Sequence, residues 1–199
     1  MTQTPTKRTS TRKKATTEIS LDLPANPFAF EVLDLLSAQK TNDKKVEVLK
    51  KYEDPSLKTL FIWNFDDTVV TILPPGEVPY SNLKSEQQFR GTLSDKVENL
   101  VDTMEYNNTS SLGSAADMKQ GHTTIRREYK KFYNFVKGGN NSLTSLSRET
   151  MFIQMLEGLH PFEAQILCLV KDKKLQTKYK ITKEIVSEAY PDIQWGGRS

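Results

Sequence analysis

The sequence is poor in the residue types from which most catalytic and metal sites are built. It has one cysteine, Cys168, and two histidines, His122 and His160, in 199 residues. These are too few for a disulfide framework or for a structural zinc site of the usual kind. The phosphate-loop, dinucleotide-binding and HExxH patterns are all missing from it. We therefore expect a non-enzymatic protein with no cofactor, no metal and no small-molecule substrate.

Long hydrophobic runs are also missing. No apolar stretch approaches the roughly 18 residues that cross a bilayer, and the charged N-terminus is not followed by the apolar segment of a secretory signal. A single cysteine suits a reducing compartment. We expect a protein that does not contact membranes and that lies in the cytoplasm, or in the host cytoplasm if it is viral.

Positive charge is concentrated at the N-terminus. The net charge is +3, and residues 1–17 carry five basic and no acidic side chains, so the remaining residues carry a net charge of −2. Residues 1–20 have too few apolar residues to fold alone, and we expect a disordered basic tail. Such a tail either binds phosphates or only keeps the protein soluble.

The rest of the chain, 21–199, shows helical periodicity and predicts a single all-α domain of about eight helices. A first helical block, 26–105, begins at Asn26-Pro27, a typical helix start, and a third helix is expected to start at Asp54-Pro55. An extended proline-rich connector follows near Pro74–Tyr80, with at most one short strand, within Thr68–Leu73, before it. Apolar residues at helical spacing then predict a helix over 93–104. Residues 106–124 are rich in Asn, Ser, Gly and Thr and predict a mobile loop. A second helical block, 125–195, follows, and its first helix is expected over Ile125–Val136.

Three chemistry-bearing residues have simple structural interpretations. Cys168 lies between Leu167 and Leu169 in an apolar helix, so we interpret it as a buried structural thiol. His160 precedes a proline at a helix start, where it is expected to be a cap or a surface residue. Asp66 is expected only to end the third helix.

One stretch interleaves aromatic and basic residues. In Arg126–Phe135, helical spacing puts the aromatic side chains on one face and Arg127, Lys130 and Lys131 around the rest. Basic residues beside aromatic ones can bind phosphates and stack on bases. The alternative is an ordinary amphipathic helix whose aromatic residues belong to the core.

A second stretch, Lys171–Lys183, holds six lysines and one acidic residue directly before a predicted helix. Thr182 is expected to cap that helix, and the helix start together with the lysines favours an oxyanion site over a solvated loop. The front block has a comparable turn with Lys44 and Lys45. The residues expected to bind nucleic acid are Lys173, Lys174, Lys178, Lys180, Thr182, Lys44, Lys45, Arg127, Lys130 and Lys131.

The two blocks share a pattern of helix, polar turn and second helix, in Phe30–Tyr52 and again in Ser147–Leu167, followed by the lysine turn that ends at Thr182. This arrangement resembles the N-terminal DNA-binding domain of ATP-dependent DNA ligases, the phage enzymes in particular, over roughly 28–66 and 125–194. The chain is also similar to uncharacterised proteins of large tailed phages. The resemblance implies a helical bundle of two pseudo-repeated blocks that binds the backbone and minor groove of DNA.

Two departures from the ligase pattern matter. The family's turn glycine is missing, since no glycine occurs between Lys171 and Ala189, which weakens the case for close backbone approach to a phosphate. The nucleotidyltransferase motif Lys-x-Asp-Gly is also missing, so an adenylated enzyme cannot form by the ligase route. The resemblance therefore implies a DNA-binding module without the catalytic part.

The sequence predicts a non-catalytic protein that binds duplex or nicked DNA with weak sequence specificity, in replication or repair and alongside other proteins of those processes. The alternative is a helical protein–protein interaction adaptor with an incidental basic tail. The negative net charge outside the tail, the Pro74–Tyr80 connector and the 106–124 loop support that alternative.

Overall fold

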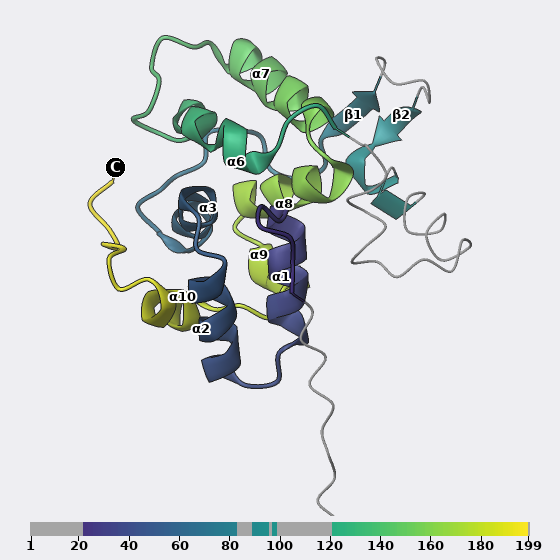
Figure 1. Cartoon of the computed structure of the whole chain (residues 1–199). Coiled ribbons are helices and arrows are strands. Elements are labelled where there is room, and N and C mark those ends of the chain that lie inside the picture. The colour runs from purple at the N-terminus through teal and green to yellow at the C-terminus, as the bar shows by residue number, and fades with distance from the viewer. Residues whose placement is uncertain (1–21, 83–88, 96, 99–120, 199) are drawn as a thin grey trace, which may run out of the picture.

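The computed structural model describes residues 22–82, 89–95, 97–98 and 121–198, and within them the chain is mostly helical (Figure 1). The prediction of an all-α fold is confirmed. The expected basic tail and most of the expected 106–124 loop lie outside the described residues. So does most of the helix expected over 93–104, although Leu93–Asp95 are helical.

The first block contains three helices that follow one another closely. They are α1 (Ala29–Ala38), α2 (Asn42–Lys51) and α3 (Pro55–Phe65). The start of α3 is encoded locally, because Asp54 accepts a hydrogen bond from the Ser56 amide at 2.8 Å and Pro55 occupies the first turn. The predicted start of α1 at Asn26 is wrong by two residues. The cap position is Phe28, and Asn26 instead contacts the second block.

The second block contains the remaining described helices. They are α6 (Ile125–Glu128), the 3-10 helix η1 (Tyr129–Phe135), α7 (Ser145–Gly158), α8 (Pro161–Lys171), α9 (Leu175–Lys178) and α10 (Lys183–Ala189). His160 is the cap of α8, as predicted, with its Nδ1 accepting from the Phe162 amide at 3.2 Å. The lysine stretch was not expected to contain a helix, so the single turn of α9 is a correction.

The aromatic–basic stretch is less regular than its sequence suggests. We expected one α-helix from Ile125 to Val136, but only α6 is α-helical and η1 continues it as a 3-10 helix. Phe132 and Phe135 are buried, whereas Tyr133 is 53% exposed. The aromatic side chains therefore do not all share one face.

The extended connector forms a small amount of β-structure. Strand β1 (Pro79–Asn82) pairs antiparallel with β2 (Phe89–Thr92), with Pro79 opposite Thr92. We expected at most one short strand, within Thr68–Leu73, and that segment contributes only the isolated bridge between Thr71 and Val136. The bridge ties the connector to the end of η1.

Both blocks contribute to a single hydrophobic cluster. Helix α8 lies at the centre, with α1 and α3 from the first block beside it, α6 and α7 on one side, and α2 and α10 at the opposite end (Figure 1). Fully buried side chains come from both blocks: Leu33, Leu60 and Phe61 from the first, Leu156, Leu167 and Val186 from the second. Burial at about 25 cal/mol per Å² of apolar surface makes this cluster the main stabilising feature of the fold.

Two buried carboxylates hydrogen-bond to segments that lie far from them in the sequence. Asp66, expected only to end α3, accepts hydrogen bonds from the Gly196 amide at 2.9 Å and from Arg198 at 2.5 Å. Glu163 of α8 is 1% exposed and accepts from the amides of Ala29 at 3.2 Å and Ile125 at 3.0 Å. One carboxylate thus holds the first turns of α1 and α6 together.

Candidate nucleic-acid interface

The fold brings together the two lysine-rich turns that the sequence separates. Helix α2 packs on α10 (Figure 1), and the link that follows α9 contacts the last turn of α1. The Lys45 ammonium donates a 2.6 Å hydrogen bond to the carbonyl of Lys180, across a separation of 135 residues. The Lys180 amide donates to the Ser37 hydroxyl at 3.3 Å. The turn between α1 and α2 and the link between α9 and α10 therefore form one continuous surface.

Three lysines of the predicted set are exposed on this surface. Lys44 follows the cap of α2, whose Thr41 hydroxyl accepts from the Lys44 amide at 3.4 Å. Lys174 begins α9, and Lys180 follows it. Lys40, which the sequence analysis did not single out, is exposed in the same turn as Lys44. We call Lys40, Lys44, Lys174 and Lys180 the lysine surface.

Lys178 lies at the border of this surface in a more restricted setting. Its ammonium contacts the Gln165 amide oxygen and lies 5.7 Å from the centre of the Phe162 ring. Desolvation by these neighbours lowers the pKa of Lys178, and the charge of Asp34 opposes this shift. A lysine with nearby carboxylate and aromatic partners can still contact a phosphate, but it must first give up part of these contacts.

Two predicted residues are used inside the fold instead. Lys45 is only 9% exposed, and its ammonium is held by the Lys180 carbonyl. Lys173 has a positive φ of 55° and donates to the Asp66 carbonyl at 2.6 Å, and burial lowers its pKa. Direct contact of these two ammonium groups with DNA stays a prediction, and it requires that each one leaves its carbonyl partner. Their role is to position the turns that carry Lys44, Lys174 and Lys180.

The predicted side-chain cap at Thr182 is wrong. Thr182 occupies the cap position of α10, but its side chain accepts no hydrogen bond from the helix amides. It instead hydrogen-bonds to Glu184, which contributes to lowering the pKa of that carboxyl. Helix α10 has only seven residues, and an acidic side chain already occupies its first turn. These features do not support the oxyanion site that the sequence predicts at this turn.

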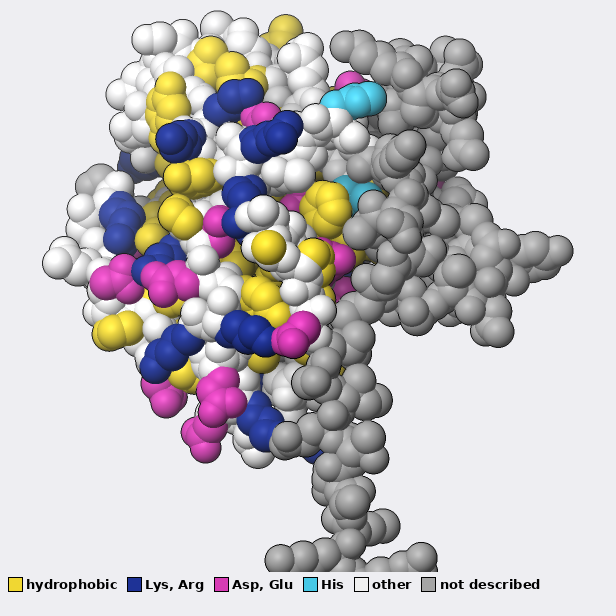
Figure 2. Space-filling view, in the orientation of Figure 1, with side chains coloured by type: hydrophobic (Ala, Val, Ile, Leu, Met, Phe, Trp, Pro, Cys, Tyr) yellow, Lys and Arg dark blue, Asp and Glu magenta, His cyan; other side chains and the backbone are white. Residues whose placement is uncertain are grey.

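The remaining predicted basic residues lie on other elements. Arg127 lies in α6 and lines a pocket, and Lys130 and Lys131 are exposed on η1. Lys131 pairs with Glu128 at 2.6 Å. In Figure 2 the Lys and Arg side chains on the displayed face extend from the upper helices to the lower ones, with Asp and Glu among them in the lower part. The basic side chains thus form two groups, the lysine surface and the α6–η1 residues.

Sequence comparison assigns the chain to a family. The match to a family described only as one of unknown function covers residues 32–102 and 98–177. The chain belongs to this family, DUF6433. No curated protein and no solved structure matches it. The DUF6433 match includes α2, α6 and α8, and it leaves out α10.

The pocket beside Arg127 contains residues that sequence reasoning missed in this DUF6433 protein. Asn26, Arg126 and Glu163 line it together with the first turns of α1, α3 and α6. The sequence alone identifies Arg126 as a basic residue of the aromatic–basic stretch. It gives no sign that Glu163 differs from any other acidic residue in the first turn of a helix. Only the folded chain shows that it is buried between two helix starts.

Two findings concern covalent and metal chemistry in the part of the chain that the structure describes. Burial raises the pKa of the Cys168 thiol to about 12, which disfavours the reactive thiolate. Within the described ranges, no three His, Cys, Asp or Glu side chains are arranged to hold a metal ion. No helix in that part of the chain is long and apolar enough to span a membrane.

Proposed function

We propose that this DUF6433 protein is a non-catalytic DNA-binding protein that contacts the phosphate backbone of duplex or nicked DNA through the lysine surface. The observation that carries the proposal is the Lys45–Lys180 hydrogen bond, which joins two basic turns 135 residues apart. The resemblance to ligase DNA-binding domains is the reason why we also propose a role in replication or repair.

The lysine surface has the properties expected of a backbone-binding site. Its members are exposed, long and flexible, and they come from two segments that the core holds rigidly. Phosphate contacts of this kind fix the position of a protein on DNA without reading bases. The buried Phe132 and Phe135 are not available to stack on bases. These features support backbone binding with weak sequence specificity.

Electrostatic binding of this type has a clear experimental signature. Each phosphate that a lysine neutralises releases condensed counterions, so the slope of log K against log salt is about −0.9 per contact on duplex DNA. Replacing Lys44, Lys174 and Lys180 with glutamine in the full chain should reduce the magnitude of this slope by about two to three. Affinity for a 20-base-pair duplex should fall by at least tenfold at low salt.

The control variant loses the same number of positive charges, but on a different surface of the protein. Lys130, Lys131 and Lys137 are exposed on and after η1, and their replacement with glutamine also removes three positive charges. A second control replaces the five basic residues of 1–17 with glutamine. Fluorescence anisotropy with nicked, intact and single-stranded DNA at two salt concentrations compares all four proteins.

The proposal requires the lysine-surface variant to lose more affinity than the η1 variant. Equal losses in both would mean that only net charge matters, and binding that disappears with the tail charges alone would place the activity outside the helical domain. Either result would favour the adaptor, whose test is partner binding that survives these replacements and fails after changes within Pro74–Tyr80.

A further inference from the structure

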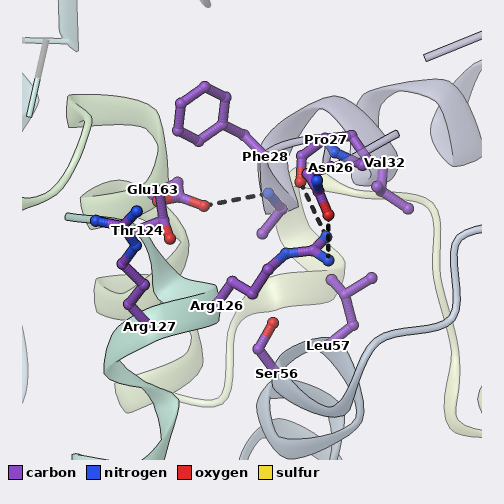
Figure 3. Close-up of a pocket in the computed structure, with 11 residues that line it drawn as sticks. Asn26, Pro27, Phe28, Val32, Ser56, Leu57, Thr124, Arg126, Arg127 and Glu163 are labelled. Carbon is purple, nitrogen blue, oxygen red and sulfur yellow. Dashed lines mark hydrogen bonds between the residues drawn. The ribbon is translucent and has the colours of Figure 1, made fainter. Parts of the chain in front are cut away.

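A pocket of about 360 Å³ opens where three helices begin, and the proposed DNA-binding function does not use it. Asn26, Pro27 and Phe28 enter α1 on one side, Ser56 and Leu57 begin α3 on another, and Thr124, Arg126 and Arg127 belong to α6 (Figure 3). This volume lies within the range of about 300–1,000 Å³ that small-molecule sites occupy.

One arginine of the pocket is held in place by the fold. The Arg126 guanidinium pairs with Asp54 at 2.9 Å and donates to Asn26 Oδ1 at 3.4 Å and to the Pro27 carbonyl at 3.3 Å. These three acceptors use three of its five N–H donors. Within the described residues, two donors of this fixed guanidinium remain for a ligand.

The other arginine is uncompensated. The Arg127 side chain is exposed, and its guanidinium forms no hydrogen bond or ion pair with any described residue. In Figure 3 it extends on the side of Thr124 and Glu163, whereas Arg126 reaches toward Asn26 and Pro27. The two guanidinium groups thus approach the pocket from different sides.

The acidic groups of the pocket are occupied by the protein itself. Both oxygens of Glu163 accept backbone amides, those of Ala29 and Ile125. Asp54 caps the Ser56 amide with one oxygen and pairs with Arg126 through the other. The positive ends of α1 and α3 also face this region, because their first residues line it. Arg127 is therefore a cationic group of the lining that no described carboxylate pairs with.

The remaining wall is apolar. Pro27, Phe28, Val32 and Leu57 line it next to the two arginines. A ligand that fits both parts has a compact anionic group with several acceptor oxygens and a less polar body. Arginine forks match phosphate oxygens in pairs, and a phosphomonoester carries close to two negative charges at neutral pH.

We propose that this pocket binds a phosphomonoester, the group shared by a free nucleoside monophosphate and by the 5′-phosphorylated end of a nucleic acid strand. Arg127 contacts the phosphate, the fixed Arg126 adds positive charge from the other side of the pocket, and the wall formed by Pro27, Phe28, Val32 and Leu57 contacts the attached body. The pocket shares no residue with the lysine surface, so its test does not depend on the proposed function.

The first test titrates the full chain with deoxyadenosine monophosphate, deoxyadenosine and inorganic phosphate, with calorimetry and amide NMR. The monophosphate should bind and shift the amides of Ile125, Arg126 and Arg127, whereas deoxyadenosine should not bind. The R127Q variant should weaken binding by about ten- to a hundredfold, as expected for loss of one charge-assisted contact. The matched control K137Q also removes an exposed positive charge, away from the pocket, and should leave binding unchanged.

Further arms separate the two sources of the ligand. A 12-nucleotide strand with a 5′-phosphate is compared with the same strand ending in a 5′-hydroxyl. A gain from the 5′-phosphate that R127Q abolishes assigns the site to strand ends, and monophosphate binding without such a gain assigns it to free nucleotides. No binding of either phosphate-bearing probe, or equal binding by wild type and R127Q, would overturn the proposal while leaving the lysine-surface experiment unaffected.

Discussion

The buried carboxyl of Glu163 gives a sharp prediction about stability and pH. Its two oxygens accept the amides of Ala29 and Ile125, and it is 1% exposed. Burial raises the pKa of Glu163 to about 7 from its ordinary 4.5, although the two amide hydrogen bonds act in the opposite direction. The perturbation that tests this balance is Glu163→Gln, which keeps the shape of the side chain and removes its titration.

The direction of the effect follows from proton linkage. Because the pKa of Glu163 is higher in the folded protein than in the unfolded chain, the folded state binds the extra proton between pH 4.5 and 7. Its contribution to stability is complete below pH 4.5 and is lost as the pH rises through 7. A shift of this size at about 1.4 kcal/mol per pH unit corresponds to about 3 kcal/mol.

Urea unfolding at pH 5 and pH 8 measures this contribution. From Glu163 alone, the wild type should lose about 2 to 3 kcal/mol of unfolding free energy between these pH values. Since other groups also titrate in this range, the decisive quantity is the difference between wild type and variant. The Glu163→Gln variant should lack that part of the dependence, and Glu188→Gln, an exposed carboxyl on α10, should retain it. An identical pH dependence in all three proteins would refute the reasoning.

Three further predictions concern other buried contacts. Burial raises the pKa of Asp66, but hydrogen bonds from Gly196, Thr68 and Arg198 outweigh this effect and lower the pKa to about 2. Asp66 therefore contributes about 2 kcal/mol to the free energy of unfolding above pH 3.8, and this contribution is lost as the pH falls toward 2. The Asp66→Asn variant should lack the contribution in urea unfolding at pH 7. Lys45→Met should cost about 1–2 kcal/mol in the same assay, because the Lys180 carbonyl loses its donor, whereas exposed Lys50→Met should change stability by less than about 0.5 kcal/mol. Cys168 should resist iodoacetamide at pH 8 in the native protein and react fully in urea, as mass spectrometry would show, because burial raises the pKa of its thiol.

Helix starts were predictable because their signals are local. Asp54 with Pro55 and His160 with Pro161 begin α3 and α8 as expected, since a capping side chain and a proline act within one turn. Asn26 with Pro27 carries the same signal, yet α1 starts two residues later. There the Asn26 side chain accepts from Arg126, 100 residues away, and a contact of that range has no local signature.

In the aromatic–basic stretch, a three-residue spacing of aromatic residues indicates the 3-10 helix, but it is easily read as the 3.6-residue period of an α-helix. Tyr129, Phe132 and Phe135 are three residues apart, which is the repeat of a 3-10 helix, and both phenylalanines are buried. A period of 3.6 residues fits Tyr133 equally well, but Tyr133 is exposed. Over seven residues the two periods differ too little for the sequence alone to separate them.

The candidate site was predictable as a region but not residue by residue. Counting lysines correctly marked both turns as basic, yet the count could not show which ammonium groups the fold uses. Lys45 and Lys173 bond to carbonyl groups of Lys180 and Asp66, which lie 135 and 107 residues away in the sequence. Long-range partners of this kind also explain why the role of Glu163 was missed.

The two proposed sites lie at opposite ends of α1, and this arrangement suggests that one ligand uses both. The pocket is at the first turn of α1 and the lysine surface begins directly after its last turn. Ten residues at 1.5 Å each separate them by about 15 Å, which is about four phosphates of one strand along a duplex axis. If one duplex end spans both sites, R127Q and the triple lysine variant should each weaken binding of the same 5′-phosphorylated duplex, and their effects should multiply. R127Q should then have no effect on the 5′-hydroxyl duplex. Unchanged affinity of R127Q for the phosphorylated duplex would show that the two sites serve different ligands.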